Sequence, residues 1–458
     1  MSEEYASYKK MRISKNGQFH RWLVPLYLLI AASSIRFPLT TAGLPFRLFV
    51  GNILFMVVVA IGLLRGLRTR AGPTSLPPHI LLPTMLLILQ GLVSIIYARL
   101  NPTLHTADVF QQMDNAWTLH NIAEMLLLLG LPLALIVMPQ FIQQVHDVRR
   151  VVMACTAPGL LYALIAIWTT PFAHYAHLMM LTIRQPSIFS RATGISSTQL
   201  IFFVCIALGQ ALYARRRVAA CCWWLTTLIL ILATTLSLER TAWITLCVSA
   251  MVMLGLRHRN IGVIPLILAL LLPLLLPIIL HIIVPNQSNT ADDQSRWWEA
   301  LDIWQRHPWL GVGAGNYQFA ARLYGMDAGE GAHNQFLELL AEMGLQGVLC
   351  LLWMIIAIGY ISLQRFMKAV SATGKAIALS YLGYYTTLLI LSFSGNTFLP
   401  SLGEIHGTAD QIFASYHWLL LGIVLALPRW EIAGTHPALP KPLPGPQKQL
   451  QTEREPST

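Results

Sequence analysis

The chain has 458 residues, of which 55% are hydrophobic and only 11% are charged, and its formal net charge is +11. Ordinary soluble domains carry about 25% charged residues, so this composition excludes a soluble globular protein. The positive charge does not indicate nucleic-acid binding, because basic residues in a membrane protein first set the orientation of its spans.

Long apolar runs recur along the chain, and each approaches the roughly 20 residues that a helix needs to cross the hydrocarbon layer. No small-residue cleavage site follows the first run, which we interpret as a retained span. We predict an all-α integral membrane protein with about twelve transmembrane helices. They are expected at residues 22–35, 48–64, 79–98, 117–137, 151–170, 199–213, 218–236, 241–256, 261–284, 346–363, 376–394 and 413–428.

Basic residues gather in alternate connections between these runs. If residues 1–21 are cytoplasmic, seven basic segments agree with the positive-inside rule, and every lysine lies inside. Both termini are therefore placed in the cytoplasm, and the Pro-rich residues 429–458 are expected to form a flexible tail. Transmembrane helices 1–9 fall within 22–284 and helices 10–12 within 347–428, and a long periplasmic loop, 285–346, separates the two groups.

Arginines are the only basic residues left on the predicted outer face apart from histidines. The planar guanidinium group matches phosphate oxygens, so this face is expected to hold a phosphorylated anion. Alternatively, each arginine pairs with an outer acidic residue or a lipid headgroup. The outer arginines are Arg36, Arg47, Arg99, Arg184, Arg191, Arg240, Arg296, Arg306 and Arg322.

The long outer loop contains an amphipathic pattern followed by glycines. Trp297, Leu301 and Trp304 share one helical face of residues 293–306, which predicts an amphipathic helix near the membrane surface. His307-Pro308 ends that helix, and a glycine run at 311–315 follows. These glycines either let backbone N–H groups approach an anion or form a tight irregular turn.

His333 precedes a second helical pattern in the same loop. Residues 335–343 have helical spacing, and Gly344 is a natural stop. At the N-terminal end of a helix the dipole favours a neutral imidazole, which can accept a proton as a general base does. A histidine at this place is also often a cap or a packed side chain. We find no acidic cluster with metal-ligand spacing, and predict no metal.

Residues 333–347 resemble the bacterial O-antigen ligase and polymerase superfamily. His333-Asn334, nine residues, Gly344, two residues and Gly347 are similar to the ligase signature, and 307–317 is similar to the superfamily's His-Pro and glycine-rich element. The resemblance implies an inner-membrane glycosyltransferase with a periplasmic active site, metal-independent and without a cofactor. Its donor would be O-antigen on undecaprenyl diphosphate, and its acceptor a sugar hydroxyl of lipid A-core.

The same resemblance implies roles for individual residues. His333 would be the base or the group that orients the acceptor, and the diphosphate would be bound by Arg191, Arg240 and Arg296. Arg191 matches an Arg-x-x-Gly element, whereas Arg240 has unusual neighbours for its element. Further candidates are Asn334, Arg322, Asn316 and Arg306.

Three other functions remain open from the sequence. An O-antigen polymerase would use the same donor but extend a lipid-linked chain, and a protein O-oligosaccharyltransferase would modify a Ser or Thr of a protein. A transporter would show repeat symmetry and ionisable residues within its spans, of which Glu124 is the clearest here. All of these functions involve membrane lipids as neighbours, and none involves nucleic acid.

Overall fold

The computed structural model describes most of the helical part of the chain. The residues described are 22–30, 38–39, 48–69, 77–101, 104, 114–142, 144–169, 197–236, 240–258, 288–326, 331–399 and 407–435. The predicted span at 261–284, the connection that contains Arg191 and the tail beyond Thr435 lie outside these residues.

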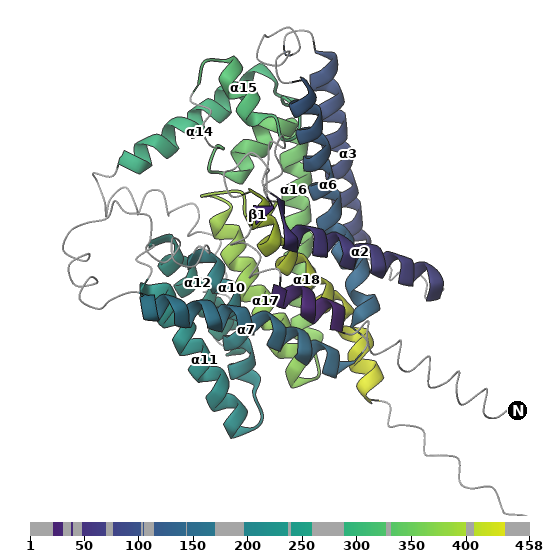
Figure 1. The fold of residues 1–458 in the computed structure, drawn as a ribbon, viewed down its shortest axis with the longest axis vertical. Coiled ribbons are helices and arrows are strands. Elements are labelled where there is room, and N and C mark those ends of the chain that lie inside the picture. The colour runs from purple at the N-terminus through teal and green to yellow at the C-terminus, as the bar shows by residue number, and fades with distance from the viewer. Residues whose placement is uncertain are drawn as a thin grey trace, which may run out of the picture.

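Helices make up almost all of the described chain, as predicted for an all-α protein (Figure 1). The exception is an antiparallel pair of two-residue strands, β1 (Pro38–Leu39) and β2 (Leu48–Phe49). Residues 22–30 are helical. The helices that follow are α2 (Val50–Thr69), α3 (Pro78–Leu100), α6 (Asp114–Phe141), α7 (Val145–Thr169), α10 (Ser197–Tyr213), α11 (Arg217–Leu236), α12 (Arg240–Arg257), α14 (Ser288–Arg306), α15 (Tyr317–Leu323), α16 (Gln335–Lys368), α17 (Ala372–Leu391) and α18 (Gly407–Thr435).

The candidate spans among the described residues are fewer than predicted. Four helices are long and apolar enough to cross a membrane, namely Pro78–Leu100, Val145–Trp168, Arg217–Leu236 and Gln335–Lys368. The two halves of α6 on either side of Pro132 add a fifth if they form one bent span. Shorter apolar helices lie at four more predicted places, Val50–Arg65, Gln199–Tyr213, Thr241–Arg257 and Ala414–Pro428. The multi-pass character is therefore shown, whereas the count of twelve stays a prediction.

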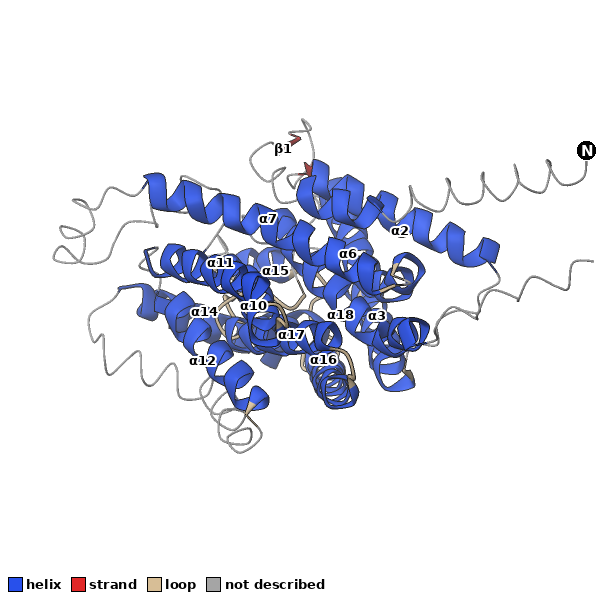
Figure 2. Cartoon of the chain, turned by 90° about the horizontal axis from the view of Figure 1, so that it is seen from below, coloured by secondary structure: helices blue, strands red, loops and turns tan. Residues whose placement is uncertain are grey.

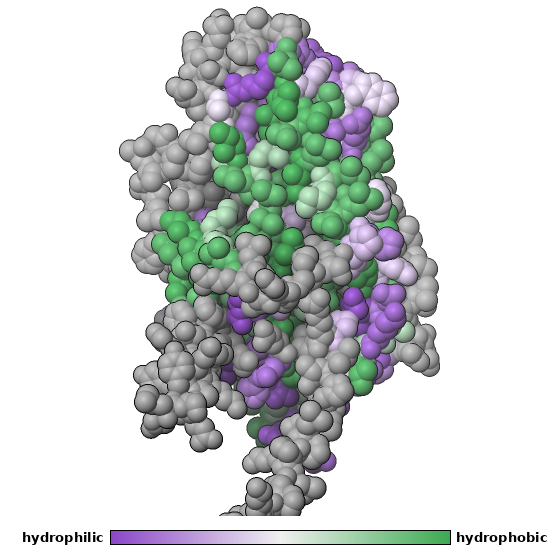
Figure 3. Space-filling model, turned by 90° about the vertical axis from the view of Figure 1, so that its right-hand side faces the viewer, coloured by the Kyte–Doolittle hydropathy of each residue, from purple (hydrophilic) through white to green (hydrophobic). Residues whose placement is uncertain are grey.

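Apolar side chains cover the outside of α3 as well as its packed face. Leu82, Leu89 and Ile96 of α3 are about half exposed, as expected for side chains that contact lipid. Figure 3, which faces the right-hand side of Figure 1, shows an apolar area across the middle of this side with hydrophilic residues toward both ends. The surface thus has the banded polarity of a protein that crosses a membrane.

The centre of the bundle is formed by α10, α17 and α18. Figure 2 shows these helices with α7 on one side and α12 and α16 on the other. Phe202 of α10 is fully buried and contacts the rings of Tyr384 on α17 and Tyr416 on α18. At one end of the bundle, α14 and α15 lie beside α16 and the upper part of α3 (Figure 1). This end holds the predicted site residues of the outer loop, whereas Arg240 begins α12.

The long outer loop contains helices, as predicted. The predicted amphipathic helix at 293–306 is α14, which begins earlier, at Ser288, and buries Ala300 and Ile303 completely.

The C-terminal helix extends further than expected. The flexible tail was predicted to begin at residue 429, but α18 continues to Thr435. Pro428 lies inside this helix without ending it.

Candidate functional site

A glycine loop, residues 311–316, lies along the first part of α16. The amide of Val312 donates to the carbonyl oxygen of Ala341 at 3.0 Å, and the amide of Gly313 to that of Glu342 at 2.8 Å. The helix breaks two residues later, so these carbonyl groups would otherwise lack the donors of the next turn. The loop therefore completes the end of a helix that is distant in sequence.

The amides of the glycine loop donate to acceptors within the protein. Gly311 donates to His307 O at 3.0 Å, Ala314 to Ser94 Oγ at 3.2 Å, Gly315 to the Glu342 carboxylate and Asn316 to Gly313 O at 3.0 Å. Because these N–H groups are already used, they do not form a cradle for an anion. Of the two interpretations of the glycine run, the structure favours the tight irregular turn.

The break in α16 lies at Gly344, where the sequence predicts the end of a helix. Gly344 has φ 69° and ψ −170°, within a longer element that continues to Lys368. The carbonyl group of Trp309 lies against its α-carbon, and a Cβ there would be 2.1 Å from the Trp309 oxygen. Only glycine fits both this backbone conformation and this contact. The first part of α16 is therefore an independent helix of residues 335–343.

His333 lies in a strained turn directly before this helix. Its φ is 49°, a left-handed conformation that is uncommon for residues other than glycine, although histidine adopts it more often than most. On one side, the Asn334 side chain caps α16, and its Oδ1 accepts from the amides of Phe336 at 3.1 Å and Leu337 at 3.2 Å. On the other side, the amide of Ala332 donates to Glu338 Oε2 at 2.9 Å. The half-buried imidazole is thus presented by a turn that is fixed at both ends.

The segment after α17, residues 392–399, anchors the same turn. The amide of Gln335 donates to Ser392 O at 2.9 Å, and its side-chain oxygen accepts from the amide of Phe398 at 3.0 Å. Asn396 Nδ2 donates to Glu338 Oε1 at 2.6 Å. These contacts join parts of the chain more than fifty residues apart, since Asn396 is 58 residues from Glu338.

Tyr317 connects Arg296 with the His333 turn. Its hydroxyl donates to the backbone carbonyl oxygen of Arg296 at 3.4 Å, near the upper limit of a hydrogen bond. Burial raises the pKa of Tyr317 well above its usual value, with a further increase from the negative charge of Glu338 and a smaller opposing effect of Arg296. Tyr317 thus joins the backbone of Arg296 on α14 to the start of α15, and its amide donates to Glu342 of α16.

The remaining described candidates are engaged in local structure. Arg306 forms an ion pair with Asp302 at 2.9 Å and lies over the ring of Tyr324 at 4.4 Å. Asn316 is fully buried, precedes α15 and donates to Val312 O at 3.0 Å. Arg322 is exposed in the last turn of α15. Arg306 and Asn316 therefore stabilise the structure around the site.

The described part of the structure does not include the side chains of Arg240 and Arg191. Arg240 is the first residue of α12, but its side chain is not among those that the structure describes. Arg191 lies outside the described residues. The convergence of three arginines on one diphosphate thus stays a prediction.

Polar residues of α6 pack against the glycine loop at Gly315. A Cβ at Gly315 would lie 3.1 Å from Cγ of Glu124 and 3.2 Å from the ring of His120. Glu342 accepts from the amide of Tyr317 at 3.1 Å on the opposite side. Glu124, the best candidate for a transporter residue in the sequence, therefore packs against the glycine loop next to the site.

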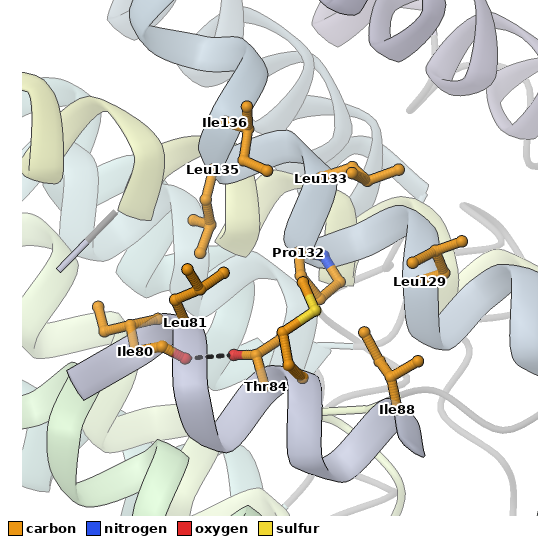
Figure 4. A pocket seen from close by; sticks show the side chains of 10 residues that line it. Ile80, Leu81, Thr84, Ile88, Leu129, Pro132, Leu133, Leu135 and Ile136 are labelled. Atoms are coloured by element: carbon orange, nitrogen blue, oxygen red, sulfur yellow. Dashed lines mark hydrogen bonds between the residues drawn. The ribbon is translucent and has the colours of Figure 1, made fainter. Parts of the chain in front are cut away.

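Two hollows on α3 and α6 contain none of the predicted site residues. The smaller one, shown in Figure 4, has about 10 Å³ of space between apolar side chains such as Ile80 and Leu133, which is too little for more than about one water molecule. The larger one, a groove of about 330 Å³, is apolar from Ile88 to Leu129 and ends at Arg99 and Thr118, which are hydrogen-bonded to each other.

No group of three or more His, Cys, Asp or Glu side chains among the described residues is arranged to hold a metal ion. The sequence pointed to His333, Asn334 and Arg296 but not to Glu338, Tyr317 and Asn396, which lie around them in the structure. Glu338 could have been noted as an acidic residue on the buried face of a helix, where it needs partners. Tyr317 and Asn396 give no such signal.

Comparison with known families identifies the segment that carries this site. The family model of the O-antigen ligase matches residues 225–352, which include Arg240, Arg296, the glycine loop and the His333 turn. No curated protein matches the chain. The matched segment covers the signature from His333 to Gly347 in full, and the helices around it are those of a multi-pass membrane protein. Residues 225–352 are thus similar to the O-antigen ligase family.

Proposed function

We propose that the protein is an O-antigen ligase of the bacterial inner membrane. It transfers O-antigen polysaccharide from undecaprenyl diphosphate to a sugar hydroxyl of lipid A-core, on the periplasmic side. The observation that carries this proposal is the His333 turn, in which a partly exposed imidazole is presented by a left-handed residue between a capped helix and a buried carboxylate.

The reaction needs one base and a stabilised leaving group. In the transfer, the bond between the anomeric carbon and the phosphate oxygen breaks, and a bond to the acceptor oxygen forms. His333 takes the hydroxyl proton of the acceptor, or orients that hydroxyl, and undecaprenyl diphosphate leaves with the negative charge. Both effects act in the transition state, where positioned charge contributes most to rate.

Arginines are the groups suited to the diphosphate. Arg296 is supported by its place on α14 beside Tyr317, within the segment that the family model matches. Arg191 and Arg240 complete the proposed diphosphate site from earlier outer connections. A guanidinium group remains charged and binds two oxygens at once, which suits a diphosphate that leaves with negative charge.

The apolar groove between α3 and α6 fits the lipid part of such a donor. Its walls are formed by side chains such as Leu92 and Met125, and the polar Arg99 and Asn121 lie among them. The same two helices hold the glycine loop through Ser94 and Glu124. A polyprenyl chain in this groove would lie beside the helices that position the site.

A deletion strain complemented with variants tests the proposal. The His333→Ala protein should insert and fold like the wild type but fail to attach O-antigen to lipid A-core, with polymer retained on the undecaprenyl carrier. Full attachment by this variant would overturn the role of His333.

The deletion phenotype separates the alternatives. Loss of capped lipopolysaccharide together with accumulated carrier-linked polymer supports the ligase, whereas lipopolysaccharide capped with a single repeat indicates a polymerase. Loss of glycan from a protein with unchanged lipopolysaccharide indicates a protein O-oligosaccharyltransferase.

A further inference from the structure

Glu338 is a buried acidic residue that no motif of the sequence assigns to the reaction. Its side chain is only 4% exposed and lies on the first turn of α16. Each of its carboxylate oxygens accepts one hydrogen bond, Oε2 from the amide of Ala332 and Oε1 from Asn396 Nδ2. A buried carboxylate is costly unless it is paired in this way, so its retention requires a reason.

The two partners of Glu338 lie on either side of the strained turn. Ala332 directly precedes His333, and Asn396 belongs to the segment that also binds Gln335. A left-handed φ at a histidine costs about 1–3 kcal/mol and persists only where the surroundings hold it. Asn334 fixes the helix side of His333, and Glu338 fixes the other side.

We propose that Glu338 is a positioning residue for His333, acting through a clamp formed by Ala332, Glu338 and Asn396. The clamp holds the His333 backbone in its left-handed conformation and thereby sets the direction of the imidazole. Glu338 itself does not touch the substrates. Since the reactive role of His333 belongs to the proposed function, the catalytic effect of the clamp rests on it.

The chemistry of the clamp provides a specific test. The Glu338→Leu variant keeps the approximate size of the side chain but has no acceptor, so the buried Ala332 amide and the Asn396 side chain both lose their partner. The Glu338→Gln variant keeps an oxygen for the Ala332 amide, and its NH₂ group can donate to the Asn396 side-chain oxygen, which has no partner in the described structure, once that amide turns over. Glu338→Gln therefore keeps the clamp without the charge, whereas Glu338→Leu removes it.

Kinetics of full-length variants in vesicles should show this difference. Glu338→Leu should lower kcat by about 100-fold, as expected for a misplaced catalytic group, with the KM of donor and acceptor little changed. Glu338→Gln should retain at least about tenfold more activity than Glu338→Leu, because it keeps the acceptor for the Ala332 amide. Asn396→Ala, which leaves the Ala332 bond in place, should reduce kcat less than Glu338→Leu and keeps the test valid if Glu338→Leu does not fold.

Hydrogen–deuterium exchange tests the clamp independently of activity. The amide of Ala332 should exchange faster in Glu338→Leu than in the wild type, and its exchange in Glu338→Gln should lie close to that of the wild type. Ser371→Ala removes the N-cap of α17 at the end distant from the site and should leave this exchange and kcat unchanged. Unchanged Ala332 exchange or wild-type kcat in Glu338→Leu, or a Glu338→Gln variant no better than Glu338→Leu, would overturn the clamp.

The two proposals fail in different ways. If His333→Ala retains transfer, the role of His333 is wrong while faster Ala332 exchange in Glu338→Leu still supports the structural clamp. If His333→Ala is inactive but Glu338→Leu and Asn396→Ala have wild-type kcat, the clamp is wrong and the proposed function stands.

Discussion

The backbone of Gly344 lies against the carbonyl group of Trp309, so closely that a methyl group on Gly344 would be 2.1 Å from the Trp309 oxygen. Gly311 makes a similar contact in the reverse direction, with its α-carbon against the carbonyl group of Glu342. Two segments of backbone therefore meet without side chains between them, and this contact fixes the position of the glycine loop along α16.

Gly344→Ala is expected to destabilise the protein strongly. The substitution adds a clash with Trp309 to a backbone conformation, φ 69° and ψ −170°, that is essentially restricted to glycine and costs another residue about 1–3 kcal/mol. Thermal unfolding in detergent should show a large decrease in Tm. Gly325→Ala shares the positive φ but has open space around it, and Gly395→Ala has open space without a positive φ. The expected order of Tm is Gly395→Ala, then Gly325→Ala, then Gly344→Ala, and equal losses in the last two would contradict the contact.

Asn334→Ala should cost about 1 kcal/mol of stability, because it removes the acceptor for two amides at the start of α16. Asn334→Asp keeps an acceptor and should lose less. Ser371→Ala removes a similar cap from α17, so its loss of stability should be comparable. Transfer assays should separate them: only Asn334→Ala releases one side of the His333 turn and should lower activity. Equal activity of the Asn334→Ala and Ser371→Ala variants would argue against this role of the cap.

The stability of the outer segment should decrease in mild acid because of His307. Burial lowers the pKa of His307 below its usual value, and the charge of Arg306 lowers it further. The unfolded chain then takes up a proton near its ordinary pKa of about 6.5 before the folded protein does, so stability falls as the pH decreases below that value. The neutral ring pairs with the Tyr324 hydroxyl at 2.8 Å. Tm measured from pH 7.5 to 5 should decline less steeply for His307→Gln, and parallel curves would contradict the assignment.

Arg296→Ala should reduce transfer at least about tenfold in kcat/KM for the lipid-linked donor, since a charged donor to the diphosphate would be lost. Arg296→Lys should fall between the two, because lysine keeps the charge without the planar pair of donors. Arg217→Ala, an exposed arginine at the start of α11, serves as the control for a change in net charge. If Arg296→Ala transfers as well as Arg217→Ala does, Arg296 is not part of the diphosphate site.

Much of the local structure could be predicted from the sequence, since it depends on neighbours in the chain. The apolar spacing of residues 293–306 gives α14, and Gly344 marks the break in α16. The place of His333 at the start of that helix follows from the same pattern. These features depend on helix periodicity and on glycine, and both are visible in a single sequence.

The partners of the site residues could not be predicted in this way. Asn396 and Ser94 bind the site from distant parts of the chain, and neither belongs to a pattern that announces it. Arg306, a candidate as one of the outer arginines, forms an ion pair with Asp302 and lies over the ring of Tyr324, which is distant in sequence. Pairing across the fold depends on packing, which one sequence does not contain.

The break at Gly344 also turns the signature spacing into a length. Between Asn334 and Gly344 the helix holds nine residues, or about 14 Å of axial rise. Asn334 fixes one end, and the contact with Trp309 fixes the other. One inserted residue would turn His333 by about 100° around the helix axis relative to the glycine loop, even though every side chain of the site would still be present. The number of residues in this helix therefore sets the distance and direction between the imidazole and the glycine loop.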